Sequence, residues 1–85
     1  MKLLETSKFQ RLRKKIKGDA ERSALKKALA EVEKTPSVGK KLKGEFSFLR
    51  SYPYTVERKA RRLIYRWEKD VIAVFSFVPR QGIYK

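Results

Sequence analysis

Arginine side chains interrupt an apolar stretch near the C-terminus in a pattern that could bind phosphate. Residues 61–67 read RRLIYRW, so Arg62 and Arg66 lie on either side of Ile64, each two positions from it. In a β-strand these three side chains share one face, because successive side chains alternate across the strand. Guanidinium groups there could grip a phosphate in fork geometry. The pair alone leaves a second interpretation equally open, in which these arginines only keep an open sheet face soluble.

Another arginine and a tyrosine follow the last apolar stretch. Residues 80–84 read RQGIY, which places Arg80 and Tyr84 just past a strand that Pro79 ends. A tyrosine can stack on a base, donate a hydrogen bond, or act as a base where cations lower its pKa from about 10. On these residues alone, an aromatic side chain that covers the end of the sheet is the simpler interpretation.

Lysine clusters could contact a nucleic-acid backbone without reading its sequence. One cluster, at Lys40, Lys41 and Lys43, lies between the expected helices and strands, and another lies at residues 13–17. Most charge runs of this kind are solvated surface. The chain as a whole has 23 Lys and Arg against 9 Asp and Glu, a net charge of +14, which favours a polyanionic partner.

The composition excludes several kinds of chemistry. The chain contains no His and no Cys, so it lacks the usual zinc ligands, a thiolate nucleophile and the usual acid–base catalyst near neutral pH. Its few carboxylates are scattered, and it has no glycine-rich phosphate loop. We therefore expect no metal and no cofactor. No apolar run approaches the roughly 20 residues of a membrane span, and no signal peptide is evident, so we expect a cytoplasmic protein without a membrane partner.

Two helices are predicted in the N-terminal half. Thr6 or Ser7 can cap the first helix, and Gly18 ends it. Asp19 can cap the second helix, which stops before Pro36 because proline disfavours helical backbone in the preceding residue. Their buried faces are expected to contain Phe9, Leu12, Ile16, Ala24, Leu25, Ala28, Leu29 and Val32.

Four strands are expected around these helices, over residues 2–6, 45–52, 60–67 and 71–78. Pro53 should end the second strand, which leaves residues 54–59 as a loop. In the third strand, Leu63, Tyr65 and Trp67 should face the helices, with Arg61 on the same side, because this side holds the larger apolar area. The last strand is apolar on both faces, as a central strand is.

The order β-α-α-β-β-β predicts an α+β fold in which a small, mainly antiparallel sheet has two N-terminal helices packed on one face. The length of 85 residues corresponds to one domain, residues 1–85.

Four segments, taken in order, resemble the RelE/ParE superfamily, the toxins of type II toxin–antitoxin pairs. They read KLKG at residues 41–44, LR at 49–50, RLIY at 62–65 and RQGIY at 80–84. The resemblance covers essentially the whole chain, and it is the order and spacing of the segments that is specific. It implies a RelE-like toxin domain with the fold above, which cuts messenger RNA in the ribosomal A site as a metal-independent endoribonuclease.

The resemblance also implies roles for three residues. Arg62 matches an arginine that steadies the scissile phosphate. Arg80 matches one that contacts the reacting phosphate and assists the leaving group, and Tyr84 matches a tyrosine that orients a base or transfers a proton. RelE carries two lysines on the strand before RLIY, where this chain has one cation only. The residues expected to bind RNA are Lys41, Lys43, Arg50, Arg58, Lys59 and Arg66.

Two other functions stay open. ParE-type members of the superfamily poison DNA gyrase and cut no RNA, and a non-catalytic basic module would bind the ribosome or RNA with strongly salt-dependent affinity. The resemblance further implies an acidic, RelB-like antitoxin as a partner, besides the ribosome and messenger RNA. A disordered segment of that antitoxin would fold on the toxin surface.

Overall fold

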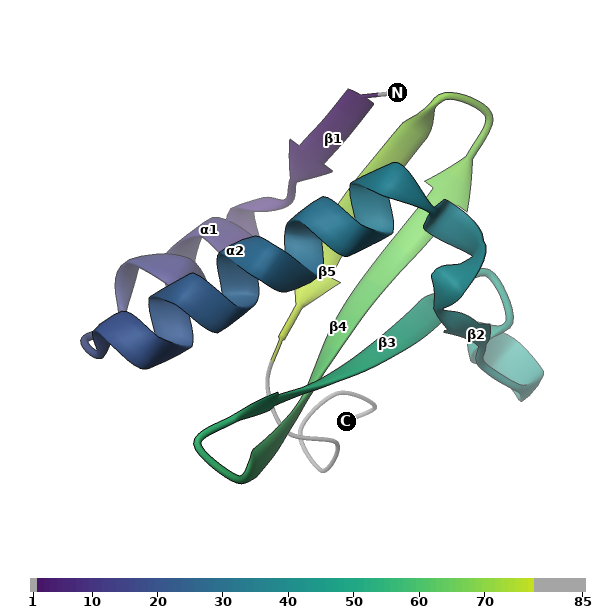
Figure 1. The fold of residues 1–85 in the computed structure, drawn as a ribbon. Coiled ribbons are helices and arrows are strands. Elements are labelled where there is room, and N and C mark those ends of the chain that lie inside the picture. The colour runs from purple at the N-terminus through teal and green to yellow at the C-terminus, as the bar shows by residue number, and fades with distance from the viewer. Residues whose placement is uncertain (1, 78–85) are drawn as a thin grey trace.

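A five-stranded sheet with two helices on one face forms the fold (Figure 1). The strand order is β1-β5-β4-β3-β2, in which β1 pairs with β5 in parallel and every other pairing is antiparallel. This arrangement confirms the predicted α+β class. The computed structural model describes residues 2–77, and its elements are β1 (Lys2–Glu5), α1 (Ser7–Lys14), α2 (Asp19–Lys34), η1 (Pro36–Val38), β2 (Lys40–Lys41), η2 (Gly44–Phe46), β3 (Arg50–Val56), β4 (Lys59–Glu68) and β5 (Val71–Ser76).

Helix α1 begins where the sequence predicts and ends earlier. The Thr6 hydroxyl caps the helix by accepting from the Phe9 N–H at 3.2 Å, and it donates to the Val74 carbonyl of β5 at 2.9 Å. The helix was expected to continue to Gly18, but it ends at Lys14. The next N–H groups bond three residues back, which tightens the last turn. Ile16 remains buried beyond this end.

Helix α2 has its apolar face on the sheet. Gly18, rather than Asp19, is the N-cap residue, and Asp19 lies in the first turn, where a carboxylate favours the helix dipole. Leu25, Ala28 and Val32 are buried as predicted. The helix ends at Lys34, two residues before Pro36. Among residues 2–77, no helix is long and apolar enough to cross a membrane.

The core lies between the helices and the sheet, with α1 against β5 and α2 against β3. Phe9 and Phe77 meet edge to face, with ring centroids 5.6 Å apart, and join α1 to the end of β5. Strand β5 lies between β1 and β4, which agrees with its prediction as a central strand. The buried cluster contains Phe9, Ile16, Leu25, Ala28, Val32, Leu63, Tyr65, Ile72, Val74 and Phe77.

The predicted strand over residues 45–52 is correct only for residues 50–52, and the expected loop over residues 54–59 is only a turn at residues 57–58. Residues 44–46 form the short helix η2, and β3 runs from Arg50 to Val56, through Pro53, which pairs with Arg62. Proline lacks an N–H, so it fits a strand only where no ladder bond is needed. Beyond Ser51, the outer edge of β3 carries no paired strand among the described residues, because β2 pairs only with Arg50 and Ser51. Pro53 is therefore tolerated within the strand.

Candidate functional site

Strand β4 carries the RLIY segment and separates its side chains between two faces. Leu63 and Tyr65 point into the core and are fully buried. Arg61 lies on the same side, as predicted, and its Nε is 2.8 Å from Glu21 Oε1 of α2. Arg62 and Ile64 occupy the alternate positions and so belong to the opposite face.

Arg62 is held in place by the neighbouring strand. Its Nη1 donates to Ser51 Oγ of β3 at 3.2 Å, and Ser51 is buried. A half-buried guanidinium with one fixed hydrogen bond has fewer conformations to lose when it binds a ligand, so Arg62 is partly pre-organised.

A cavity of about 480 Å³ lies beside Arg62. No carboxylate among the described residues lines it, whereas several cations do. Clefts lined by one sign of charge concentrate counter-ions, so this cavity suits an anion. Its lining residues are Lys40, Lys41, Leu42, Lys43, Phe46, Ser51 and Arg62. We call it the Arg62 cavity.

The lysines reach this cavity because β2 is fastened to the sheet. Lys40 pairs with Ser51 in the antiparallel β2–β3 ladder. Just before it, the Tyr65 hydroxyl accepts from the Gly39 N–H at 2.9 Å and donates to the Pro36 carbonyl. A Cβ on residue 39 would lie 2.5 Å from the Tyr65 hydroxyl oxygen, so only glycine fits there without a shift.

The tyrosine of the RLIY segment is therefore an anchor within the fold. Burial raises the pKa of Tyr65 above its ordinary value, so the hydroxyl keeps the proton that it donates. The sequence predicted residues 37–44 as a basic loop and missed this fastening. The glycine directly before the lysine pair was the available signal.

A second cavity, of about 470 Å³, lies between the N-terminal end of β3 and the C-terminal end of β4. Lys41 lines both cavities, which makes them neighbours. The lining residues of the second cavity are Lys41, Ser47, Phe48, Arg50, Arg66, Trp67 and Glu68. We call it the Trp67 cavity.

Trp67 lies on the predicted side of β4, opposite the buried Ile72 of β5, but it is not part of the buried core. Trp67 is 37 % exposed, because it lies near the end of β4, beyond the last β3–β4 pair, Arg50 and Tyr65. The Arg50 guanidinium carbon lies 5.2 Å from the centroid of the Trp67 ring, a cation–π contact. Arg50 also donates to the Gly39 carbonyl at 2.8 Å. Arg50 thus belongs to the Trp67 cavity and does not line the Arg62 cavity.

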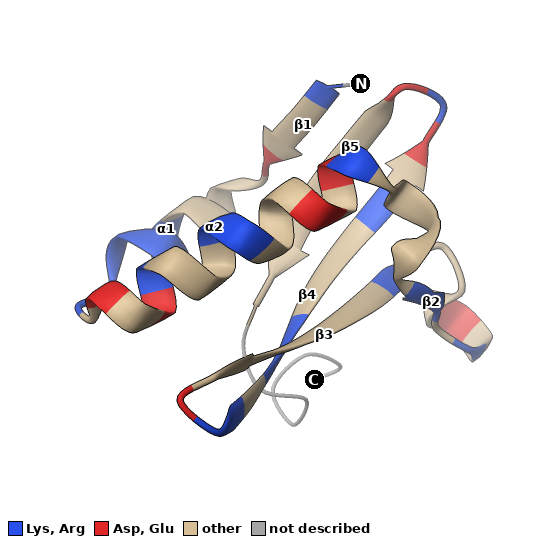
Figure 2. Cartoon of the chain, in the orientation of Figure 1, with Lys and Arg blue, Asp and Glu red and all other residues tan. Residues whose placement is uncertain are grey.

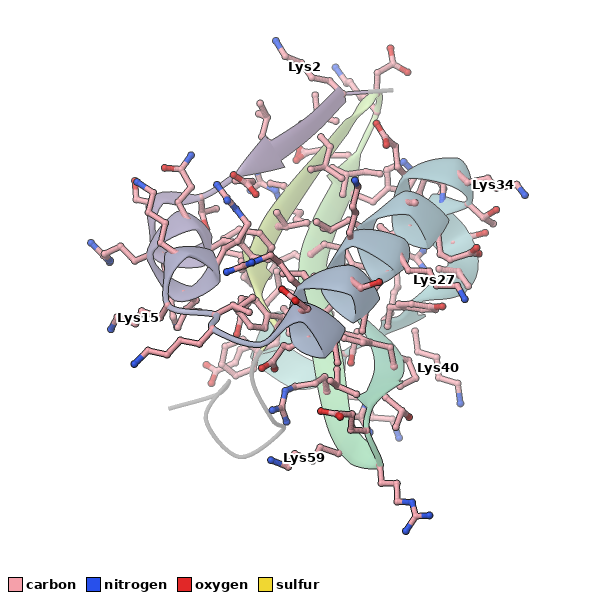
Figure 3. The ribbon with its side chains drawn as sticks, turned by 60° about the vertical axis from the view of Figure 1, so that its left-hand side comes forward. Lys2, Lys15, Lys27, Lys34, Lys40 and Lys59 are labelled. Atoms are coloured by element: carbon pink, nitrogen blue, oxygen red, sulfur yellow. The ribbon has the colours of Figure 1, made fainter. Side chains whose placement is uncertain are left out.

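The other residues named from the sequence lie farther away or are not described. Arg58 and Lys59 lie at the β3–β4 turn and line neither cavity. Lys59 is three residues from Arg62 along β4, about 10 Å at the usual rise. Figure 3 shows Lys40 and Lys59 projecting from different parts of the surface. Arg80 and Tyr84 lie outside the described residues.

Basic residues extend beyond the two cavities. Figure 2 shows Lys and Arg on both helices and on β2, β3 and β4, with fewer acidic residues among them. Arg13 of α1 is paired with Glu5 at 2.8 Å. Arg66 lies 3.6 Å from Glu68, and both side chains are exposed, so this pair is weak.

One comparison with known proteins gave a match. The family model described as a ParE-like toxin of type II bacterial toxin–antitoxin systems matches residues 3–85, almost the full length. A search of the curated proteins found no match.

Proposed function

The chain belongs to the ParE-like toxins of type II bacterial toxin–antitoxin systems, and we propose that it acts as a ribosome-dependent endoribonuclease that cuts messenger RNA and halts translation. The observation that carries this proposal is the Arg62 cavity. It joins an oriented arginine to a group of lysines and, within the described residues, contains no competing carboxylate.

The reaction would be attack of a ribose 2′-OH on the adjacent phosphate. Negative charge grows on the phosphate oxygens in the transition state, and a fixed guanidinium stabilises that charge more than it stabilises the substrate. Arg62 is the group proposed for this role. Lys40, Lys41 and Lys43 add positive charge around the same space. They also offer a replacement for the strand lysines that the superfamily resemblance leads one to expect.

Proton transfer is the weaker part of this site. The chain has no His, and lysine, arginine and tyrosine titrate far from neutral pH. By the superfamily resemblance, Arg80 assists the leaving oxygen and Tyr84 orients a base or moves a proton. Positioning must then supply much of the rate, and a ribosome that presents a splayed codon would provide it. We therefore expect free RNA to be cut poorly and ribosome-bound messenger to be cut well.

The test is cleavage in a purified translation system, followed by mapping of the new 5′ ends. Arg62→Ala should lower the rate by roughly 10²–10³, as loss of one oxyanion donor does. Arg11→Ala, which removes the same charge from an exposed position on α1, is the matched control and should leave the rate unchanged. An unchanged rate in Arg62→Ala, or equal cleavage of free and ribosome-bound RNA, would contradict the proposal.

Inhibition of DNA gyrase is the second candidate function. Two observations favour it: the matched family is described as ParE-like, and the described lining of the Arg62 cavity contains neither a histidine nor a carboxylate that could act as a base. A supercoiling assay with purified gyrase distinguishes the two candidates. Inhibited supercoiling with intact messenger would support the gyrase function, whereas salt-dependent RNA binding without cleavage or gyrase inhibition would identify a basic binding module.

Membership in a type II system gives this toxin a cognate antitoxin. We propose that the antitoxin is acidic and RelB-like, because the toxin has a net charge of +14. We also propose that the pair acts in the cytoplasm, where ribosomes and messenger are present. A small acidic open reading frame beside the toxin gene would support this proposal, and a basic neighbour would oppose it.

A further inference from the structure

We propose that the Trp67 cavity is a base-stacking subsite for single-stranded messenger RNA, in which one base lies against Phe48 and Trp67 and its phosphate lies on Lys41 and Arg66. The identity of the RNA rests on the proposed function. The subsite itself rests on the geometry of the second cavity.

The two aromatic side chains are unusually exposed for a chain with so small a core. Phe48 is 56 % exposed and Trp67 is 37 % exposed, and both line the same cavity. The volume of about 470 Å³ falls within the range of roughly 300–1,000 Å³ found for small-molecule sites. Exposed aromatic rings that share a hollow provide a stacking surface for any base.

The indole ring is held in a fixed orientation. Its Nε1–H donates to the Lys69 carbonyl at 3.3 Å, in the turn after β4. The guanidinium of Arg50 lies over the ring at 5.2 Å and is itself tied to the Gly39 carbonyl. A platform fixed in this way loses little conformational entropy when a base stacks on it.

The charge around these rings favours a nucleic acid over an apolar peptide. Lys41, Arg50 and Arg66 line the cavity, and Glu68 is the single carboxylate that lines it within residues 2–77. The exposed pair between Arg66 and Glu68 is long, at 3.6 Å, so a phosphate can displace the carboxylate at small cost. Cations beside aromatic rings are the combination that binds single strands without strong sequence preference.

The position of the subsite connects it to the proposed cleavage. Lys41 lines both cavities, and its pairing partner Arg50 is the neighbour of Ser51, which orients Arg62. A nucleotide in the Trp67 cavity would therefore lie next to the nucleotide whose phosphate contacts Arg62. Stacking there would help to hold the scissile linkage in the Arg62 cavity.

The chain reports on this subsite directly, because Trp67 is its only tryptophan. The experiment titrates the full chain with a short single-stranded RNA and follows Trp67 fluorescence. The matched ligand is an abasic ribose-phosphate oligomer of equal length and charge. We expect the RNA to quench the emission and to bind roughly 5- to 100-fold more tightly than the abasic oligomer, the range expected from loss of one stacked base.

Substitutions in the Trp67 cavity test whether it causes the preference for RNA over the abasic oligomer, with binding of a labelled RNA as the measurement. Phe48→Ala and Trp67→Ala should lose most of the preference for RNA over the abasic oligomer, and Trp67→Phe should retain it. Leu4→Ala removes an exposed apolar side chain from β1, at the other edge of the sheet, and should change nothing. Phe48 lies on the surface, so its variant keeps the test valid if Trp67→Ala fails to fold.

Three results would overturn the proposal. The first is equal affinity for RNA and the abasic oligomer, and the second is quenching by poly-glutamate but not by RNA. The third is a Phe48→Ala variant that binds RNA as the wild type does, while the Trp67 emission of the wild type stays unquenched by RNA. The measurement needs neither ribosome nor cleavage. Failure of the proposed nuclease function is therefore seen separately, as intact messenger in the translation assay.

Discussion

Removal of the Tyr65 hydroxyl should show best how the Arg62 cavity is held together. Tyr65→Phe deletes one oxygen from a fully buried side chain and leaves the ring in place. It strands two backbone groups, the N–H of Gly39, which is buried, and the carbonyl of Pro36, which is partly buried. Those groups belong to the segment that brings the lysines of β2 to Arg62.

The expected loss of stability follows from these two partners. A buried donor or acceptor left without a partner costs about 1–3 kcal/mol. The Pro36 carbonyl can recover part of this from water, so we expect a total loss of about 2–3 kcal/mol. For a domain of this size, a loss of 1 kcal/mol lowers Tm by about 4–8 °C. The variant should therefore melt about 10–20 °C below the wild type. Under the proposed nuclease function it should also cleave more slowly, because β2 is loosened.

Tyr54→Phe is the matched control. It makes the same chemical change at a tyrosine whose hydroxyl is buried and, among the described residues, has no hydrogen-bond partner. Removing a buried polar atom that lacks a partner costs nothing or stabilises. We expect its Tm to equal or exceed that of the wild type, as measured by far-ultraviolet circular dichroism during heating. Equal Tm values for Tyr65→Phe and the wild type would refute the anchoring role, as would equal losses in the two variants.

Two further predictions concern the same segment. Burial raises the pKa of Tyr54 and of Tyr65 above the ordinary value of about 10, so above about pH 10 the unfolded chain loses these protons first. The free energy of unfolding should therefore be fully retained below pH 10 and fall as the pH rises. The fall should be steeper in the wild type than in the Tyr54→Phe/Tyr65→Phe double variant, as urea unfolding at several pH values can measure. Equal slopes of unfolding free energy against pH in the two proteins would contradict this. Gly39→Ala places a Cβ 2.5 Å from the Tyr65 hydroxyl and should lower Tm. Gly18→Ala, which meets no atom within 4 Å and only replaces the N-cap residue of α2, should lower Tm less.

Side-chain periodicity predicted the parts of the fold that depend on one buried face. The stripe containing Phe9 and the face containing Leu25 and Val32 identified both helices, because each helix must bury its apolar side. The same reasoning placed Arg61 toward the helices and Arg62 away from them. These are local consequences of the alternation along β4, and they do not depend on the rest of the chain.

The errors arose where a distant partner decides the local structure. Pro53 indicated a strand end, but the open edge of β3 made its missing N–H harmless. Trp67 belonged by alternation to the core face, but β4 extends past the last pairing of β3, so Trp67 has no β3 neighbour to cover it. For the candidate site, sequence reasoning placed Arg62 and the lysine cluster but did not bring them together. Their meeting depends on the contact of Tyr65 with Gly39, which are 26 residues apart.

The parallel pairing of β1 with β5 has a consequence for how this toxin folds during its synthesis. Residues 2–5 pair with residues 71–74, and Phe9 packs against Phe77, so one side of the core has no partner until the fifth strand arrives. Contacts of such long sequence separation form late, since the loop between them must first be closed. A chain still under synthesis thus exposes the inner face of α1 to solvent. The core of this fold therefore becomes complete only after residues 71–77 have been synthesised.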